Sequence, residues 1–553
     1  MSRLRGHRGT RLALLAAALV LGALLVPSAQ ALTVHCGPRQ EQLGEWPMFG
    51  RNVQSDRDQP AEHGLTDGAA ATLAPVWTFD ANRVTHEQHN EITGYPVEKD
   101  GCVFVGSSTG NNADGSHRPG WVFALNADTG DPVWATRVGG GVYSTLAVDH
   151  GIVYAFVSII GSPTLYALDQ RTGRVLWRTV VDNQFGSDAV SSPVVYDGMV
   201  WVGVSGTAAE GSSSDRTAFQ GSTVLVAAAR VSAPAFRPPS AAVATGRRTY
   251  RPGEIIRKLW SIPARDWGKG YAGGAQWGTV TIDPRTGYGY EGTGNPFNYD
   301  SEHRNTNAVL KLDLDRHRRT FGQIVGSYKG DIESVAEQGA NVVPCTQVDQ
   351  TPASTVLGVE CLRLDLDFGA TPNLVREDGG GTLVVVGQKS GVVHYIDART
   401  MRGVRKVRLG VSSPVGGMVG SGATDGTTIF GSHTIGGYLY ALSRSGTPRW
   451  VSPVADGVHW GPPVTLANGI IYVVDLKGFL DGYLASTGTP VLHRPLQLGS
   501  DPAATTNPPL SWGGTTVARG TVYVSVGVGL TSAGLPSMPD GFVIAYQPSL
   551  PVQ

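Results

Sequence analysis

The chain has few charged residues and few cysteines, and these shortages exclude several classes of protein. Charged residues make up 16% of its 553 residues, and 44 Lys and Arg nearly balance 45 Asp and Glu, for a net charge of −1. A basic surface for nucleic acid needs an excess of Lys and Arg, so we expect no nucleic-acid partner. The four cysteines form no C-x-x-C-H motif, so no covalent c-type haem is expected.

Motifs of three common enzyme classes are also missing. No Gly-rich loop ends in the Lys-Ser/Thr of a P-loop, and no Gly-x-Ser-x-Gly elbow follows a strand and opens a helix. The segment His86-Glu87-Gln88-His89 has H-E-x-H spacing. Its histidines therefore lack the i, i+4 separation that zinc requires on one helix face, and we interpret it as a polar loop.

Long apolar runs are lacking except near the N-terminus. Residues 12–26 are apolar, about 15 residues where a membrane span needs about 20. They follow a basic stretch and precede Ala29-Gln30-Ala31, an A-x-A cleavage pattern. We predict a signal peptide over residues 1–31 and a secreted or cell-envelope protein without an integral membrane segment after cleavage. An uncleaved anchor is the alternative, and the Sec and Tat routes are not distinguished. The basic residues are Arg3, Arg5, Arg8 and Arg11.

Cysteine usage agrees with an oxidising compartment. Cys345 and Cys361 share one long insertion, residues 333–367, so we expect them to pair. A bond between Cys36 and Cys102 would tie the N-terminal segment to the first repeat. Four cysteines allow three connectivities, and the sequence alone does not choose among them.

What the chain has in abundance is one repeated phrase. Eight copies of an apolar strand of the type Tyr-Ala-Leu-Asp occur, and in the clearest copies Thr-Gly and then an aromatic residue follow. Recurrence at 40 residues or more indicates stacked supersecondary units, and Gly, at 74 residues, supplies many tight turns. The copies begin at Gly120, Thr164, Gly221, Asn307, Gly391, Gly437, Gly478 and Gly541.

Between the copies lie hairpin signals, such as SSPVVYDGMVWVGV and GPPVTLANGIIYVV, in which a tight turn joins two β-branched runs. A hairpin followed by a strand, a Thr-Gly turn and a last strand makes a four-stranded antiparallel blade. The sequence therefore predicts an all-β, eight-bladed β-propeller. The eighth copy stops early, and residues 73–80, LAPVWTFD, form a strand without a repeat, so we expect this N-terminal strand to close blade eight.

These patterns divide the chain into four parts. We expect a signal peptide at residues 1–31, an N-terminal segment at 32–72, the propeller at 73–547 and a C-terminal tail at 548–553. The Ala-, Pro- and Arg-rich stretch from 229 to 252 is expected to be a surface loop.

Several stretches of this propeller resemble a known family, the PQQ-dependent (quinoprotein) alcohol dehydrogenases, in particular its polyvinyl-alcohol-dehydrogenase-like branch. They are EWPMFGRNVQSDRDQPAEHGLT, SSPVVYDGMVWVGVSG, AQWGTVTIDPRTGYGYEGTGNP and LVVVGQKSGVVHYID. The resemblance covers most of the chain after residue 31. It implies pyrroloquinoline quinone (PQQ) and Ca²⁺ on the propeller axis, a small-molecule or polymeric alcohol as substrate, and a separate electron acceptor.

The resemblance also implies cofactor-binding residues. Trp277, in AQWGTV, lies where the family places the indole that supports the flat quinone, and indole offers a large stacking area. Lys389, in GQKSG, matches the cation aimed at the quinone carbonyl, where it would stabilise developing charge. Ser205 would donate a hydrogen bond to a cofactor carboxylate. The competing interpretations are a blade-packing tryptophan, like Trp134, and a surface lysine in a hairpin turn.

Metal ligands and a catalytic base follow from the same resemblance. Asn295, in EGTGNP, and Glu210, in GTAAE, match the family's Ca²⁺ ligands, and Ca²⁺ prefers six to eight oxygen atoms. A turn Asn before proline and a solvated Glu are the alternatives. The base segment departs from the family: in SYKGDIESV, Asp331 matches the first Asp, whereas Glu333 and Ser334 replace the Trp and the catalytic Asp. Asp331 or Glu333 would serve as the base, or the base is lost.

Further departures leave two functions open. Gly139-Gly140-Gly141 stands where many members carry an Arg, Val190 replaces a Thr, and the adjacent cysteine pair is missing. The first hypothesis is a secreted quinoprotein dehydrogenase that oxidises an alcohol. The alternative is a non-catalytic propeller that acts as a protein-binding or envelope scaffold, because fold does not fix function.

Overall fold

The structure is a computed structural model. It describes residues 34–87, 89–110, 118–210, 218–298, 301–331, 366–410, 417–434, 437–454, 463–475, 477–497, 513–527 and 540–549. The predicted signal peptide lies outside these residues, as do Glu333, Cys345 and Cys361. Within the described residues, no helix is long and apolar enough to cross a membrane.

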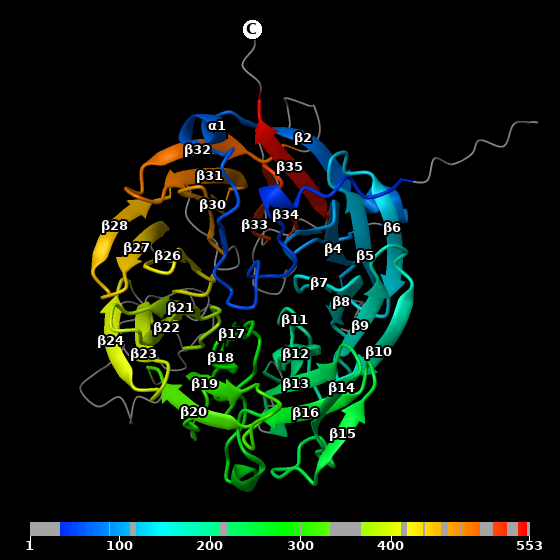
Figure 1. Ribbon diagram of the computed structural model, residues 1–553, viewed down its shortest axis with the longest axis vertical. Helices are drawn as coiled ribbons and strands as arrows, with labels where there is room; N and C mark the ends of the chain where they lie inside the picture. Colours follow the sequence, from blue (N-terminus) through cyan, green and yellow to red (C-terminus); the bar gives the residue numbers. More distant parts are fainter. Residues whose placement is uncertain are drawn as a thin grey trace, which may run out of the picture.

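Eight antiparallel blades are arranged in a ring, which confirms the predicted propeller (Figure 1). Each blade has four strands, and the predicted repeats are the third strands. In chain order, blade 1 contains β3 (Val97–Lys99), β4 (Cys102–Ser108), β5 (Gly120–Asn126) and β6 (Pro132–Val138); blade 2 contains β7 (Ala147–Asp149), β8 (Ile152–Val157), β9 (Thr164–Asp169) and β10 (Val175–Val180); blade 3 contains β11 (Val194–Tyr196), β12 (Met199–Val204), β13 (Ser222–Ala227) and β16 (Ile255–Trp260); and blade 4 contains β17 (Thr281–Asp283), β18 (Tyr288–Gly292), β19 (Ala308–Asp313) and β20 (Ile324–Lys329).

The second half of the ring repeats this order. Blade 5 contains β21 (Asn373–Arg376), β22 (Thr382–Gln388), β23 (Val392–Asp397) and β24 (Gly403–Arg408); blade 6 contains β25 (Ala423–Thr424), β26 (Thr428–His433), β27 (Tyr438–Ser443) and β28 (Pro448–Pro453); blade 7 contains β29 (Thr465–Ala467), β30 (Ile470–Val474), β31 (Phe479–Leu484) and β32 (Pro490–Pro495); and blade 8 contains β33 (Thr515–Ala518), β34 (Thr521–Val526), β35 (Phe542–Pro548) and β2 (Leu73–Asp80).

The ring is closed by its N-terminal strand, as the sequence predicts. Strand β2 pairs antiparallel with β35 from Leu73 opposite Pro548 to Asp80 opposite Phe542. Strands from the two ends of the chain therefore share blade 8, which removes an edge that would otherwise be open to pairing.

The repeated Trp and Thr-Gly positions pack neighbouring blades together. The Trp134 indole of blade 1 donates a hydrogen bond to the Gln170 carbonyl of blade 2 at 2.9 Å. A Cβ atom at Gly173, in the Thr-Gly turn of blade 2, would lie 2.5 Å from the Trp134 ring. Trp450 makes the same contacts with the next blade, to the Ala485 carbonyl at 2.9 Å and against Gly488. The turn thus needs glycine both for its positive φ and for the indole that covers it.

The N-terminal segment crosses the axis at one end of the ring, in front of the blades in Figure 1. Backbone N–H groups of inner strands all around the ring donate hydrogen bonds to the carbonyls of this segment. The donor and acceptor pairs are Val148 to Pro47, Ile282 to Val53, Thr424 to Asp56 and Leu466 to Arg57. Strand β1 (Asp58–Gln59) also pairs in parallel with β29. These contacts tie blades that are distant in sequence to one segment.

Arg57 fixes this segment in the interior. It is fully buried, and its guanidinium donates to the Val464 and Thr515 carbonyls at 2.9 and 3.1 Å. Its carbon Cζ lies 5.2 to 5.4 Å from the rings of Trp46, Phe49 and Tyr95, which adds cation–π attraction. Burial lowers the pKa of Arg57 to about 10, so the group stays charged near neutral pH.

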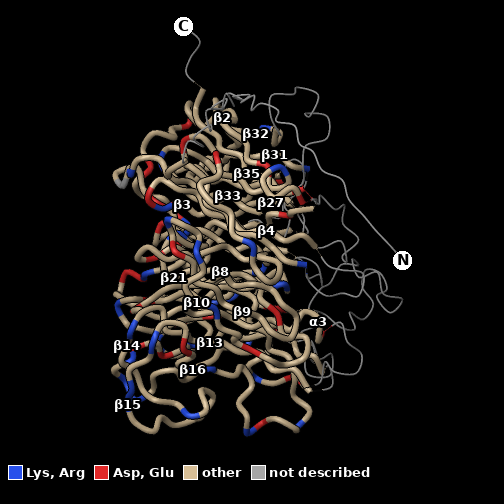
Figure 2. Tube along the Cα trace, turned by 90° about the vertical axis from the view of Figure 1, so that its right-hand side faces the viewer, with Lys and Arg blue, Asp and Glu red and all other residues tan. Residues whose placement is uncertain are grey.

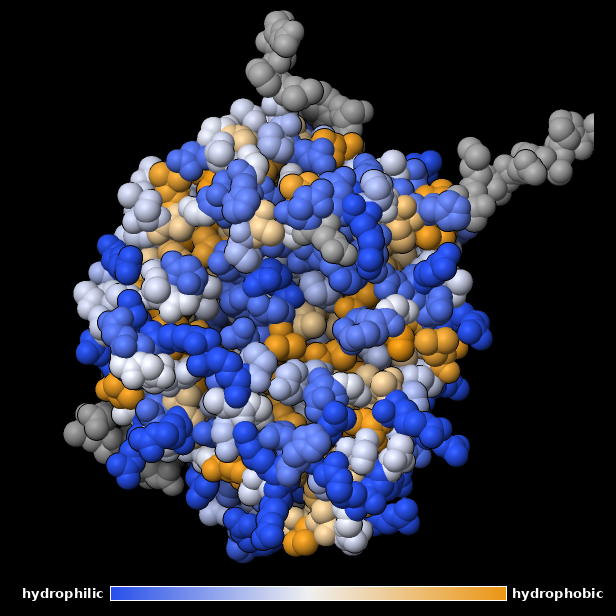
Figure 3. Space-filling model, in the orientation of Figure 1, coloured by the Kyte–Doolittle hydropathy of each residue, from blue (hydrophilic) through white to orange (hydrophobic). Residues whose placement is uncertain are grey.

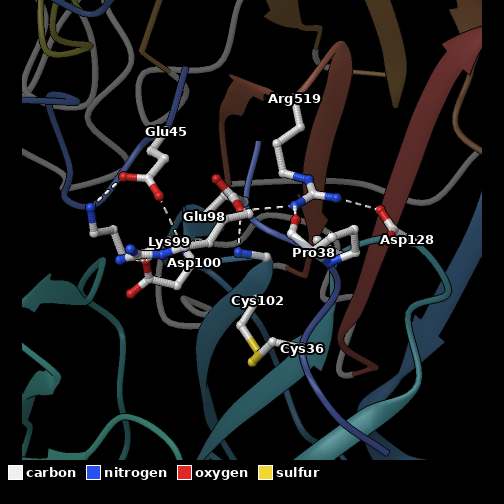
Figure 4. Close-up of polar contacts among 12 residues, drawn as sticks. Cys36, Pro38, Glu45, Glu98, Lys99, Asp100, Cys102, Asp128 and Arg519 are labelled. Atoms are coloured by element: carbon white, nitrogen blue, oxygen red, sulfur yellow. Dashed lines mark hydrogen bonds and ion pairs between the residues drawn. A yellow bond between two sulfur atoms is a disulfide. The ribbon is translucent and has the colours of Figure 1, made fainter. Parts of the chain in front are cut away.

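A disulfide and a charged cluster hold the start of the segment (Figure 4). Cys36 is bonded to Cys102 of β4, which is one of the pairings that the sequence left open. Arg519 contacts the Pro38 carbonyl and the Asp128 carboxylate, and it lies 3.8 Å from Glu98. Burial raises the pKa of Glu98 to about 8, although Arg519 opposes this shift.

The remaining elements are short. Helix α1 (Asp67–Ala71) is capped by the Thr66 hydroxyl, which accepts from the Ala69 N–H at 3.3 Å. The stretch 229–252, expected to be a loop, contains a hairpin of β14 (Val231–Pro234) and β15 (Arg247–Tyr250) beside blade 3. The others are α2 (Ala81–Thr85), α3 (Thr207–Glu210), η1 (Glu41–Leu43) and η3 (Ala264–Asp266). The face in Figure 3 is mostly hydrophilic, with scattered apolar areas.

Candidate functional site

The predicted site residues come from loops at the end of the ring opposite the N-terminal segment. Ser205 and Glu210 follow β12, Asn295 follows β18, and Lys389 follows β22, so all lie between the second and third strands of their blades. Trp277 lies in the connection that leads to blade 4. Helix α3, which ends at Glu210, lies at the right of Figure 2, the side away from the viewer in Figure 1.

Trp277 and Lys389 meet at a carboxylate that the sequence analysis did not select. The Trp277 indole N–H donates to Asp367 Oδ2 at 2.7 Å. Lys389 Nζ lies 3.6 Å from the same oxygen and 5.3 Å from the centre of the Trp277 ring. The Lys389 and Asp367 side chains are 10% and 7% exposed. The two charges therefore interact in a poorly solvated place, which strengthens their attraction.

Asp367 is held in place by its neighbours along the chain. The Lys389 backbone N–H donates to the Asp367 carbonyl at 3.1 Å, which joins the start of blade 5 to the loop that carries Lys389. Two residues later, a Cβ atom at Gly369 would lie 2.1 Å from Trp277 Cη2. The segment 367–369 thus fixes both the nitrogen and the far edge of the indole, while Trp277 remains partly exposed.

Glu210 and Asn295 form a second pair. The Asn295 amide donates to Glu210 Oε1 at 2.9 Å, although the two residues come from different blades. Asn295 is 2% exposed, and its backbone carbonyl accepts from Gly274 at 3.0 Å. Glu210 is exposed at the end of α3. The contact places the Asn295 amide nitrogen, not its oxygen, against the carboxylate. The two side chains nonetheless lie side by side, and carboxylate and carboxamide oxygens are ligands that Ca²⁺ prefers.

The two groups of residues adjoin at Gly294. A Cβ atom there would lie 3.4 Å from Asp367 Oδ2, and Gly294 directly precedes Asn295. The indole, the lysine, two carboxylates and the carboxamide are therefore parts of one neighbourhood at the ends of blades 3, 4 and 5.

Ser205 lies at the entrance to α3. Its backbone exchanges both hydrogen bonds with Asp188, at 2.8 and 3.0 Å, and its hydroxyl lies 3.0 Å from Thr207 Oγ1. The residue is 5% exposed. Glu91 and Gly141 make equivalent isolated bridges in blades 1 and 2, to Ser108 and Ser158. Glu91 is a buried carboxyl that the sequence analysis did not select, and burial raises its pKa to about 8.

Asp331 points to a different set of partners. Its Oδ1 accepts from Lys406 at 2.6 Å, and its Oδ2 lies 4.0 Å from His394. Burial raises the pKa of Asp331, but His394, Lys406 and Ser390 oppose this and bring it below its ordinary value. Burial lowers the pKa of His394 to about 3, so near neutral pH Lys406 is the cation beside Asp331. Glu333 lies outside the described residues.

The residues present suit a planar acidic quinone and a hard cation. A partly exposed indole offers a flat surface, Lys389 offers a positive charge, and Glu210, Asn295 and Asp367 offer oxygen atoms. The glycine run where relatives carry an Arg is filled by backbone: a Cβ at Gly140 would lie 2.1 Å from the Ser158 carbonyl oxygen. Any counter-charge for the cofactor must therefore come from elsewhere.

Comparisons with known proteins show sequence similarity to polyvinylalcohol dehydrogenases. The chain is 25% identical over 477 residues to the polyvinylalcohol dehydrogenase of Pseudomonas sp, covering 80% of this chain and 66% of that protein. It is 25% identical over 469 residues to the polyvinylalcohol dehydrogenase of Sphingopyxis sp. (strain 113P3), covering 78% and 67%. The chain thus spans about two thirds of the length of these relatives. A family model described as outer membrane protein assembly factor BamB matches residues 65–208.

Solved structures show the same fold. The quinohemoprotein alcohol dehydrogenase from Comamonas testosteroni superposes with a TM-score of 0.63 at 15% identity, covering 91% of this chain and 80% of that one. A europium-containing methanol dehydrogenase superposes with a TM-score of 0.61 at 14% identity, covering 91% and 98%. The chain has the eight-bladed propeller of the quinoprotein alcohol dehydrogenases, and its sequence is similar to the polyvinyl-alcohol-dehydrogenase-like branch of that family.

Proposed function

We propose that the protein is a secreted, PQQ-dependent alcohol dehydrogenase with Ca²⁺ at its site. The observation that carries the proposal is the convergence of Trp277, Asp367 and Lys389, beside the Glu210–Asn295 pair. When bound, PQQ with its metal ion supplies the two-electron acceptor for alcohol oxidation. A separate electron acceptor would then reoxidise the cofactor, as the resemblance to the family implies.

The chain's own residues have distinct roles in this proposal. Trp277 supports the flat face of the cofactor, and Lys389 places a positive charge beside the carbonyl that gains electrons. Glu210 and Asn295 hold the metal ion, and Ser205 donates to a cofactor carboxylate.

We propose Asp367 as the group that accepts the proton of the substrate hydroxyl. Its carboxylate lies between the indole and the lysine, whereas the Asp331 carboxylate is bonded to Lys406. The lysine 3.6 Å away favours the ionised form of Asp367, which is the form that accepts a proton. Of the two bases predicted from sequence, Asp331 becomes a structural residue in this proposal, and Glu333 stays a prediction.

The two aspartates provide a matched test. The purified protein is loaded with PQQ and Ca²⁺, and reduction of an artificial dye is followed with primary, secondary and polymeric alcohols. Removing a catalytic base costs about 10²–10⁴-fold in rate. We expect Asp367→Asn to lose activity on this scale and Asp331→Asn to keep it within about tenfold. Equal losses, or loss only in Asp331→Asn, would exclude Asp367 as the base.

The second candidate function is a non-catalytic scaffold that binds protein in the cell envelope. The match of residues 65–208 to the model described as BamB favours it, as does the glycine run at 139–141. If the purified protein binds neither PQQ nor Ca²⁺, the scaffold function is favoured over the dehydrogenase.

A further inference from the structure

A second cluster of metal-ligating side chains lies in blade 7, separate from the site described above. Asp475, Asp481 and His493 offer ligand atoms that all lie within 4.8 Å of one another. His493 Nδ1 lies 2.7 Å from Asp481 Oδ1. Both aspartates are 1% exposed, whereas the His493 side chain is 46% exposed. The cluster is thus reachable from solvent through its imidazole.

The strand positions of these residues are unusual within the repeat. Asp481 directly precedes Gly482, and the pairing with the fourth strand becomes irregular between Gly482 and Tyr483. In six of the other seven blades this register position is apolar, and in blade 5 it is a histidine. The residues are Phe123, Tyr166, Val224, Leu310, His394, Tyr440 and Ile544. A buried carboxylate has replaced a core side chain, which is costly unless a positive partner compensates.

In blade 5, the positions equivalent to Asp475, Asp481 and His493 surround a bound group of the chain itself. His394 pairs with Val386 on the second strand and with Lys406 on the fourth, and Gln388 follows two residues after Val386. Gln388, His394 and Lys406 converge on one anion, the Asp331 carboxylate and its backbone.

Blade 7 has the same register with the opposite charge. Asp481 pairs with Val473 on the second strand and with His493 on the fourth, and Asp475 follows two residues after Val473. The amide, imidazole and ammonium groups of blade 5 are therefore replaced by two carboxylates and an imidazole. Where blade 5 encloses an anion, blade 7 is built to enclose a cation.

We propose that Asp475, Asp481 and His493 bind a divalent transition-metal ion of the Zn²⁺ type. Two adjacent buried carboxylates repel each other, and a divalent ion between them relieves this repulsion. Imidazole nitrogen together with carboxylate oxygen suits Zn²⁺ or Mn²⁺ better than Ca²⁺, which prefers oxygen alone.

The local geometry would hold the ligands ready. Asp475 Oδ1 accepts from the backbone N–H groups of Lys477 and Phe479 at 2.9 and 2.8 Å, which orients its carboxylate. The His493 ring stacks on Phe479, with centroids 4.3 Å apart and planes inclined by 3°. Such outer contacts fix the direction in which a ligand presents its atoms.

Calorimetric titration of the full secreted chain with Zn²⁺, in the presence of excess Ca²⁺, tests the proposal. We expect one saturable site that weakens at least tenfold in Asp481→Asn and in His493→Gln. His150→Gln is the matched control. His150 Nδ1 also lies 2.7 Å from a carboxylate, that of Asp149, but on the exposed surface, and no third ligand adjoins them among the residues that the structure describes. It should bind Zn²⁺ as the parent does.

The substitutions separate binding from folding. Because the His493 side chain is half exposed, His493→Gln should fold and keep the near-ultraviolet circular dichroism of the parent. If Asp481→Asn does not fold, the result for His493→Gln decides the test. Co²⁺ in place of Zn²⁺ should give visible absorption bands that His493→Gln removes. The absence of a saturable Zn²⁺ site in the parent, or binding unchanged by His493→Gln, would overturn the proposal. Neither result depends on PQQ, so the proposed dehydrogenase function is tested separately.

Discussion

Replacing Glu98 by Gln should change how the stability of the protein depends on pH. Glu98 is 1% exposed at the junction of the N-terminal segment and blade 1, and burial raises its pKa to about 8 despite Arg519 at 3.8 Å. In the unfolded chain its pKa returns to about 4.3. Between these values the folded protein keeps a proton that the unfolded chain has lost.

The sign and the size follow from this difference. A group that binds more protons in the folded state adds stability that is fully present below about pH 4.3 and is lost as pH rises toward 8. Over the middle of that range the loss is about 1.4 kcal/mol per pH unit for one group. Between pH 5.5 and 7, Glu98 should therefore lower the unfolding free energy of the parent by about 2 kcal/mol. Glu98→Gln should lack this decrease.

Urea unfolding at pH 5.5, 6.3 and 7.0, followed by tryptophan fluorescence, measures this slope. Glu254→Gln is the control. The Glu254 side chain is 41% exposed, and the hydrogen bond from the Arg251 backbone N–H lowers its pKa, so its titration ends below this range. Loss of the contacts with Arg248 and Arg251 lowers the stability of the control by a constant amount over this range, so its pH slope should equal that of the parent. A slope in Glu98→Gln equal to that of the parent would refute the assignment of a buried, protonated Glu98.

Two further predictions concern the packing of the ring. Gly173→Ala places a Cβ 2.5 Å from the Trp134 ring at a φ of +69°, whereas Gly198→Ala meets nothing within 4 Å at +73°. Both variants should lose about 1–2 kcal/mol of unfolding free energy because an L residue enters the left-handed region, and only Gly173→Ala should lose a further ~1–3 kcal/mol in thermal or urea unfolding; equal losses would contradict the proposed blade contact. Replacing Cys36 and Cys102 together by Ser opens a loop with a sequence separation of 66 and should cost about 2–4 kcal/mol; stability unchanged in this variant, measured without reductant, would show that the bond does not restrain the N-terminal segment.

Most of the fold could be predicted because the repeat is local. Each blade carries its own alternation, its tight turns and its Thr-Gly signal, so the third strands were found at the expected residues. The closing strand was predicted from what the eighth copy lacked, and the pairing of Leu73 with Pro548 confirms it. The hairpin within 229–252 was missed because an Ala-, Pro- and Arg-rich composition resembles that of a loop.

The site could be predicted only in part, because it is assembled from loops of different blades. The resemblance indicated Trp277, Lys389, Glu210 and Asn295, and the structure brings them together in two adjoining groups. Asp367, which we propose as the base, was not predicted because the resemblance placed the base in the segment after blade 4, at Asp331 or Glu333. A signal was nonetheless present: the Asp-Phe-Gly at 367–369 leads into the strand pair that carries the GQKSG motif.

The cluster in blade 7 illustrates a different limit. Its three residues are far from any motif, and only the register of the blade shows that they occupy the positions that surround Asp331 in blade 5. The register of the repeats therefore indicates a candidate site that no sequence motif marks.

The most direct test of the proposed function is a titration of the cofactor-free protein with PQQ and Ca²⁺, followed by the absorbance of the quinone and by calorimetry. We expect saturable binding at one site that requires Ca²⁺ and weakens at least tenfold in Trp277→Ala and in Asn295→Ala. Trp450→Phe, a change at a blade-packing tryptophan, should leave the binding unaltered. Absence of binding at PQQ concentrations well above micromolar, or binding indifferent to both substitutions, would contradict the assignment of a quinone site to this end of the propeller.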